Sequence, residues 1–141
     1  MLELVLILNA LWFFGGFHTF YIRRHVFGKI IVEKDQRDNQ AFQALVESGR
    51  FMGGFNFAFM VLSILVLLNM DAFDKDVQWV VILFSIAVAH ASQFFGNVPI
   101  ALQNRKGEGV WEVFKGLMLF IFVVDFTLMM ANGILAFTFY L

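Results

Sequence analysis

The stretch VQWVVILFSIAVAHASQFFGNVPIALQN, residues 77–104, decides the fold because it contains no charged residue. It lies between Asp76 and Arg105, and its 28 residues exceed the roughly 20 that an α-helix needs to cross a bilayer. His90 lies near its centre and is followed by other polar side chains, which rarely face lipid. The segment therefore predicts a membrane-spanning helix with a polar face.

The composition of the whole chain also indicates a membrane protein. Of its 141 residues, 60% are hydrophobic and 15% are charged, whereas soluble domains are about 45–50% apolar. The chain has no cysteine, which excludes disulfides, thiolate nucleophiles, Fe–S clusters and cysteine-based zinc sites. A net charge of −1 argues against a nucleic-acid partner. The start, Met1-Leu2-Glu3-Leu4, lacks the basic region of a secretory signal, so we expect the first apolar segment to be retained.

Charged residues divide the chain into four apolar segments. Nineteen uncharged residues precede Arg23, twenty precede Asp71, and the 26 residues after Lys115 contain one charge, Asp125. Backbone groups in lipid must be satisfied within the chain, and strand-like alternation is missing, so helices are expected. We predict a single all-α domain over residues 1–141, an integral membrane four-helix bundle with spans at about 3–22, 51–70, 77–103 and 112–140.

The distribution of basic residues predicts the orientation. The first connection, 23–50, carries six Lys and Arg residues, and the third carries Arg105 and Lys106. The second connection, 71–76, has one Lys among three Asp. By the positive-inside rule, the first and third connections are cytoplasmic. We therefore expect both termini outside, in a protein of the bacterial inner (plasma) membrane.

Polar side chains are expected to gather in the cytoplasmic half of the bundle. Helices rise about 1.5 Å per residue, and His90 and Asp125 each lie around ten residues from the cytoplasmic end of their span, so they share a depth. Three further polar side chains fall on the same helical faces as these two. The candidate ligand- or proton-pathway residues are His18, Asn56, His90, Gln93, Asn97, Asp125 and Asn132.

This group of side chains has a functional and a structural interpretation. In the functional one, it lines a polar cavity open to the cytoplasm, with Asp125 and His90 as an ion pair or proton-sharing couple. In the structural one, interhelical hydrogen bonds worth about 0.6–2 kcal/mol each hold the bundle together. For the Asn and Gln side chains we favour the structural interpretation. Asp125 has the stronger case for function, because a carboxylate at that depth costs a few kcal/mol.

Histidine spacing raises the question of a haem or metal site. His18 and His25 are seven residues apart and could face the same way, with His90 as a third candidate. Paired haem ligands need matched depths, and His25 is expected at or beyond the headgroups. We therefore expect no catalytic residue, no metal site and no cofactor, with haem as a lesser alternative.

Small residues at a spacing of four predict close helix contacts. Gly49-x-x-x-Gly53 and Ala87-x-x-x-Ala91 have this spacing, and Gly54 follows Gly53 directly. We expect helix packing at Gly49, Gly53, Gly54, Ala87 and Ala91. Glu47 and Arg50, at the start of the second span, are expected to form a solvated pair.

The part of the chain from about residue 50 to residue 100 resembles a known family. The segments Arg50-Phe51-Met52-Gly53-Gly54 and Ala89-His90-Ala91-Ser92-Gln93-Phe94 resemble the small four-helix membrane family of the ergosterol-biosynthesis scaffold protein. Uncharacterised bacterial four-helix proteins are also similar, with a proline closing the third helix as Pro99 does here. The scaffold family spaces its His and Ser differently by one residue and follows them with an acid where this chain has Gln93. The resemblance implies a non-catalytic membrane protein that tethers or assists enzymes acting on lipid-like substrates.

We therefore expect a non-enzymatic multi-pass membrane protein that acts as an accessory or scaffold subunit, with a lipid-like ligand in its polar cavity. Its expected partners are membrane lipid and other membrane proteins or a second copy of itself. One alternative is a small proton-coupled carrier or membrane enzyme that uses Asp125 and His90. A further alternative is a haem-bearing membrane anchor.

Overall fold

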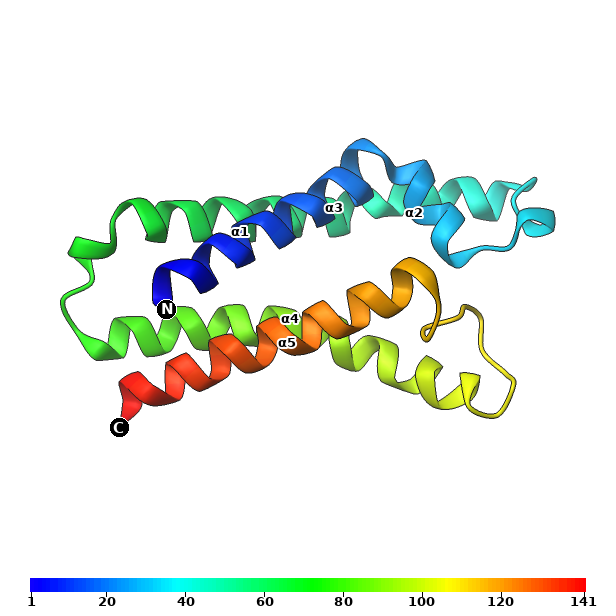
Figure 1. Ribbon diagram of the computed structural model, residues 1–141. Coiled ribbons are helices and arrows are strands. Elements are labelled where there is room, and N and C mark those ends of the chain that lie inside the picture. Colours follow the sequence, from blue (N-terminus) through cyan, green and yellow to red (C-terminus); the bar gives the residue numbers. More distant parts are fainter. The chain divides into compact units, whose positions relative to one another are not determined.

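The computed structural model describes residues 1–141, and all of its regular elements are helices (Figure 1). The all-α fold expected from the sequence is confirmed. Four helical segments are long and apolar enough to cross a membrane, and the chain is an integral membrane protein on this ground. These segments are Leu2–Ile22, Gln40–Leu68, Asp76–Asn104 and Gly116–Tyr140.

The chain forms two compact units. One comprises Ile7–Ile64, and the other comprises Met1–Leu6 together with Leu65–Leu141. Helices α1 (Leu2–Phe17) and α3 (Gln40–Leu68) each contribute residues to both units.

In the unit Ile7–Ile64, α1 continues into a turn of π-helix, η1 (His18–Ile22), followed by the short helix α2 (Arg24–Ile31). A 3₁₀ turn, η2 (Lys34–Gln36), then leads to α3. Aromatic rings join α1 to α3. The ring centroids of Phe13 and Phe59 are 5.2 Å apart, and those of Phe17 and Phe57 are 5.1 Å apart. The two helices therefore lie side by side in this unit.

Helix α3 begins well before the apolar stretch that predicted it. Its first turn is capped by Asn39, whose Oδ1 accepts a hydrogen bond of 2.8 Å from the backbone N–H of Phe42. Phe42 and Val46 are buried, while the polar residues around them are exposed. The helix thus starts at Gln40 rather than near residue 51, because a polar, capped extension precedes the apolar part.

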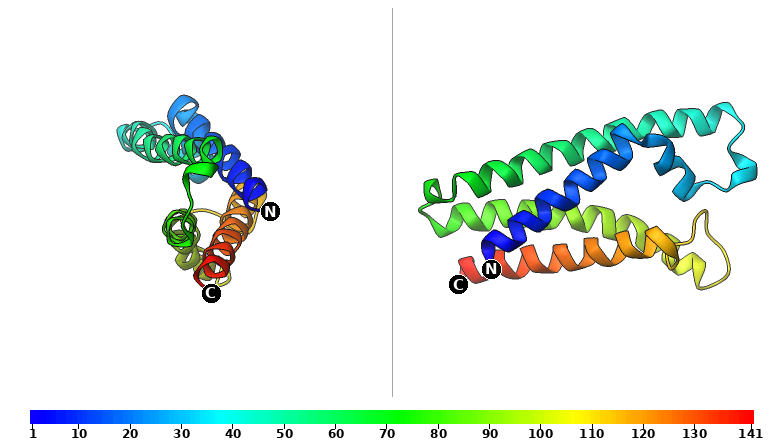
Figure 2. Two further views of the ribbon diagram at one scale, coloured as in Figure 1. Left: turned by 90° about the vertical axis from the view of Figure 1, so that its left-hand side faces the viewer. Right: turned by 45° about the horizontal axis from the view of Figure 1, so that its top comes forward.

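In the second unit, the 3₁₀ turn η3 (Met70–Ala72) follows α3, and the long helices α4 (Asp76–Asn104) and α5 (Gly116–Tyr140) pack together along their length (Figure 2). Buried residues of α4 recur at steps of three and four, at Trp79, Leu83, Ile86 and His90. A face that repeats in this way suits lengthwise packing of two helices at a small crossing angle. Helix α4 continues past Pro99 to Asn104.

Asn104 organises the connection between α4 and α5. Its Oδ1 accepts a 2.7 Å hydrogen bond from the backbone N–H of Val113, and its Nδ2 donates to the carbonyl oxygens of Glu108 and Trp111 at 3.0 and 2.9 Å. Gly109, at φ +116°, passes so close that a Cβ there would lie 2.5 Å from Asn104 Nδ2. This loop extends to Lys115, so α5 begins at Gly116 rather than near residue 112.

Candidate functional site

The central contact of the α4–α5 unit joins His90 to Asp125. His90 Nδ1 and Asp125 Oδ1 are 3.1 Å apart, and both side chains are fully buried. The sequence predicted a shared depth for these two residues, and the structure brings their side chains into contact. The regular rise of two antiparallel helices brings them to one level from positions 35 residues apart in the chain.

The surroundings of His90 limit what the pair can do chemically. One and two turns before it on the same face lie Ile86 and Leu83, both with no exposed surface. The pair can exist as an ion pair if the imidazole is protonated and the carboxyl is ionised, or as a hydrogen bond between a neutral imidazole and a protonated carboxyl. Either form links α4 to α5 between buried side chains.

Asn132 lies seven residues after Asp125 on the same face of α5 and is also fully buried. Its Nδ2 donates a 2.8 Å hydrogen bond to the carbonyl oxygen of Leu128, one turn back. Asn132 therefore continues the buried polar face that Asp125 begins.

Asn97 contacts the loop rather than His90. Its Oδ1 accepts a 3.2 Å hydrogen bond from Trp111 Nε1, and its Nδ2 donates to the carbonyl oxygen of Gln93 at 3.0 Å. Gln93 is half-buried on the same face. These bonds attach the loop before α5 to the last turns of α4, which is a structural task.

The remaining pathway candidates, His18 and Asn56, belong to the other unit. Asn56 is buried, and its Nδ2 donates a 2.8 Å hydrogen bond to the carbonyl oxygen of Met52. Its Oδ1 faces the backbone at Gly16, where a Cβ would overlap it. His18 opens the π-helical turn, and its ring centroid is 6.3 Å from that of Phe14. The candidates are thus divided between two units, and their shared cavity stays a prediction.

Of the glycines expected at helix contacts, two lie against neighbouring backbone. A Cβ at Gly53 would lie 2.6 Å from Tyr21 Cβ and 2.8 Å from Tyr21 N, and one at Gly49 would lie 2.9 Å from the carbonyl oxygen of Phe20. Gly54 differs from the expectation, because a Cβ there would meet nothing within 4 Å. Since successive helical residues are rotated by about 100°, only one of the adjacent pair Gly53-Gly54 can face the neighbour.

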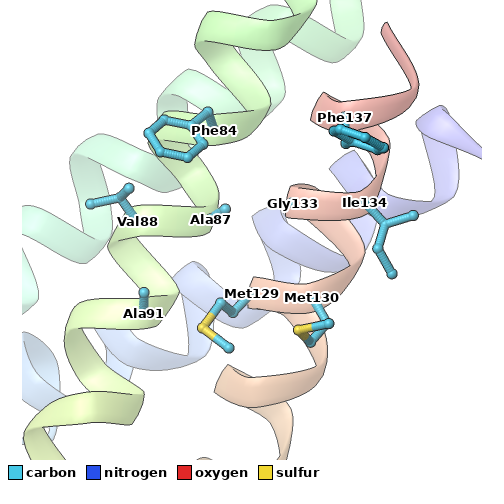
Figure 3. A pocket seen from close by; sticks show the side chains of 9 residues that line it. All are labelled: Phe84, Ala87, Val88, Ala91, Met129, Met130, Gly133, Ile134 and Phe137. Atoms are coloured by element: carbon cyan, nitrogen blue, oxygen red, sulfur yellow. The ribbon is translucent and has the colours of Figure 1, made fainter. Parts of the chain in front are cut away.

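Ala87 and Ala91 line an open groove of about 410 Å³ between α4 and α5 (Figure 3). Its floor is formed by small residues, these two alanines and Gly133, while larger side chains form its edges. All lining residues are apolar, and neither His90 nor Asp125 is among them: Phe84, Ala87, Val88, Ala91, Met129, Met130, Gly133, Ile134 and Phe137. The groove is therefore a surface of apolar character, separate from the buried polar pair.

Sequence reasoning missed several residues that are buried or form contacts within a single unit. Asn9 is fully buried in α1. Its burial could have been predicted from the sequence, because it is a polar residue in an apolar span, like Asn56. Asn104 and Gly28 carried no such signal. Their roles depend on a loop and on the contact of α2 with α3, and neither follows from spacing.

The structure contains no group of three or more His, Cys, Asp or Glu side chains placed to hold a metal ion. Comparison with protein-family models, with curated proteins and with solved structures found no match to this chain. The fold and the four apolar helices define the class of protein as a four-span all-α membrane protein.

Proposed function

We propose that the chain is a non-enzymatic multi-pass membrane protein that acts as an accessory or scaffold subunit. The main support is the complete burial of His90 and Asp125, both at 0% exposure, in a contact that links two spanning helices. A general acid or base must reach its substrate or solvent in order to transfer a proton. The apolar groove of α4 and α5 does not reach this pair, so the geometry favours a structural bond over a transport or catalytic site.

The other polar contacts support the same interpretation. Asn97 and Asn104 use their amides to attach the α4–α5 loop, and Asn56 bonds within α3. Polar side chains in the spanning helices thus stabilise the helices and their connection. Because these polar side chains bond within the protein, contacts with other proteins would be made by its surface. This is what we expect of a scaffold.

Under this proposal the partners are other membrane proteins or a second copy, together with membrane lipid. A lipid-like ligand and the resemblance to the ergosterol-biosynthesis scaffold family belong to the same proposal. The distribution of Lys and Arg supports cytoplasmic connections at 23–50 and after Asn104, with both termini outside. We propose the bacterial inner membrane as the location.

The function is tested by reconstitution and co-purification of the full chain. Wild type, Asp125→Asn and the control Thr127→Ala are placed in liposomes, and proton-coupled flux is measured with a pH-sensitive dye. Thr127 is an exposed residue near Asp125 whose Oγ1 bonds only to its own helix, at the carbonyl oxygen of Val123. We expect no flux from any of the three, and a membrane-protein partner that co-purifies in mild detergent.

Two results would overturn the accessory role. A flux present in wild type and Thr127→Ala but lost in Asp125→Asn would establish the carrier. A Soret band in the purified protein would establish the haem-bearing anchor.

The orientation is tested by cysteine labelling. Asp35 in η2 and Asp74 before α4 are both exposed, so each can be replaced by a cysteine that a reagent can reach. A membrane-impermeant reagent added from outside should label position 74 and leave position 35 unlabelled. Labelling at both positions from one side would contradict four spans, and labelling of position 35 alone from outside would invert the orientation.

A further inference from the structure

The short helix α2 lies beside the polar beginning of α3, at the level expected for lipid headgroups. A Cβ at Gly28 would lie 2.7 Å from Val46 Cγ2 and 2.9 Å from the ring of Phe42, and one at Gly49 would lie 3.1 Å from the ring of Phe27. These contacts span residues 42–49 of α3, just before the uncharged stretch 51–70. Because α3 is about 43 Å long and the hydrocarbon core about 30 Å thick, its polar beginning extends into the headgroup layer.

The inner face of α2 is fixed against the protein. Phe27 and Gly28 are buried. Arg24 Nε donates a 2.8 Å hydrogen bond to Glu47 Oε1 of α3. At the other end, the guanidinium of Arg37 donates to the carbonyl oxygens of Lys29 and Val32 at 2.9 and 2.8 Å. These contacts hold α2 in one rotational setting, so the composition of its outer face is defined.

That outer face is half basic and half apolar. His25 and Lys29 are exposed and lie one turn apart, and Val26 and Ile30 are partly exposed at the same spacing beside them. Residues four apart lie above one another on a helix, so each pair forms a ridge. A helix with adjoining basic and apolar ridges is typical of one that lies in the membrane interface.

The uncompensated positive charge of this region points outward. Arg24 and Arg50 both bond to Glu47, at 2.8 and 2.7 Å. Arg23 and Lys29, both exposed, form no ion pair within the chain. Basic side chains directly after a spanning helix attract anionic lipid headgroups.

We propose that the outer face of α2 binds the phosphate groups of anionic phospholipids. Arg23 and Lys29 contact the phosphates, while Val26 and Ile30 lie against the first carbons of the acyl chains. This proposal does not depend on the accessory role, because it needs only the setting of α2 on α3 and a surrounding bilayer.

The test measures retained lipid on the full chain. Protein is solubilised from vesicles of equal phosphatidylcholine and phosphatidylglycerol, and the bound lipids are counted by native mass spectrometry. We expect wild type to retain phosphatidylglycerol in preference to phosphatidylcholine. The double variant Arg23→Gln/Lys29→Gln should lose about tenfold or more of that preference, because each basic residue near the surface contributes to it. Salt should weaken retention in wild type, since exposed charges are screened.

A matched control separates a site from general attraction by basic residues. Lys34→Gln/Lys106→Gln removes the same charge from two exposed lysines that are expected on the same side of the membrane. This control should keep the wild-type preference. An equal loss in both double variants would overturn the site, as would equal retention of the two lipids by wild type. Displacement of phosphatidylglycerol by inorganic phosphate, beyond that caused by chloride at equal ionic strength, would assign the face to free phosphate instead.

Thermal unfolding of both double variants checks that the fold is intact. Arg23 and Lys29 have exposed side chains, so their replacement should leave the unfolding temperature near that of wild type. If Arg23→Gln/Lys29→Gln unfolds at a lower temperature than wild type, a second variant takes its place. Val26→Ser/Ile30→Ser changes the apolar side chains of the same face and leaves every charge in place. Loss of phosphatidylglycerol retention in that variant supports the interface setting, and unchanged retention overturns it.

Discussion

The two units of this chain join their helices by different means. Helices α4 and α5 are linked by a buried polar contact, His90 with Asp125, within a face of larger apolar side chains. Helix α3 instead approaches η1 through Gly49 and Gly53, where added atoms would meet the backbone of Phe20 and Tyr21. Lipid provides no hydrophobic force between spanning helices, so association relies on polar bonds or on close packing. The buried polar bond belongs to the α4–α5 unit, and close glycine packing belongs to the unit Ile7–Ile64.

The difference predicts which changes each unit tolerates. A polar link fails when its chemistry is removed, even if the volume is kept. A glycine contact fails when volume is added, whatever its chemistry.

The largest effect is expected at the His90–Asp125 pair. His90→Ala and Asp125→Ala should each lower the free energy of unfolding by about 3–5 kcal/mol if the pair is ionised, because the remaining buried group loses its opposite charge. A hydrogen bond between uncharged side chains would cost about 1–2 kcal/mol. Unfolding in mixed micelles measures these values.

The double variant decides whether the two residues act as one link. His90→Ala/Asp125→Ala should be less destabilising than the sum of the single variants, since residues in direct contact are not additive and neither charge remains. Thr127→Ala serves as the control on the same helix and should be near neutral. Strict additivity would contradict a direct contact between the two residues. In that case a polar bond would not be what links α4 to α5.

The glycine half is tested by two adjacent residues. Gly53→Ala places a methyl group 2.6 Å from Tyr21 Cβ and should cost about 1–3 kcal/mol, as overpacking does. Gly54→Ala meets nothing within 4 Å and should be neutral or slightly stabilising, because alanine favours the helix more than glycine does. Equal stabilities of the two variants would show that Gly53 does not face a neighbour.

The smallest effect is expected at Glu47, which bonds both Arg24 and Arg50 at the exposed end of the unit Ile7–Ile64. Glu47→Gln should leave the overall unfolding free energy close to wild type, because exposed ion pairs contribute little. Amide hydrogen exchange in α2 should become faster, since one of its attachments to α3 is lost. Glu33→Gln, an exposed acid without an ion pair, is the charge-matched control. A loss as large as that of Gly53→Ala would mean that charge, rather than glycine packing, holds this unit.

From the sequence alone, the relative depth of residues along each span could be predicted. Charged residues mark the ends of the apolar spans, and the helix has a constant rise, so distance along the chain converts directly into depth. This is why four spans and the shared depth of His90 and Asp125 could be predicted from spacing, whereas their contact comes from the structure. The same reasoning explains why the depth of Asp125 singled it out among the polar residues.

Only the tertiary structure decided which way each residue faces. Rotation about a helix axis depends on the neighbouring element, so the sequence could not separate Gly53 from Gly54, or assign Asn97 to Trp111 rather than to His90. The early start of α3 and the loop around Asn104 also arise from caps and turns formed by polar residues outside the spans. The depth of a residue follows from its position along one helix. The direction in which its side chain points follows from the packing of two helices, so it could not be predicted from this sequence alone.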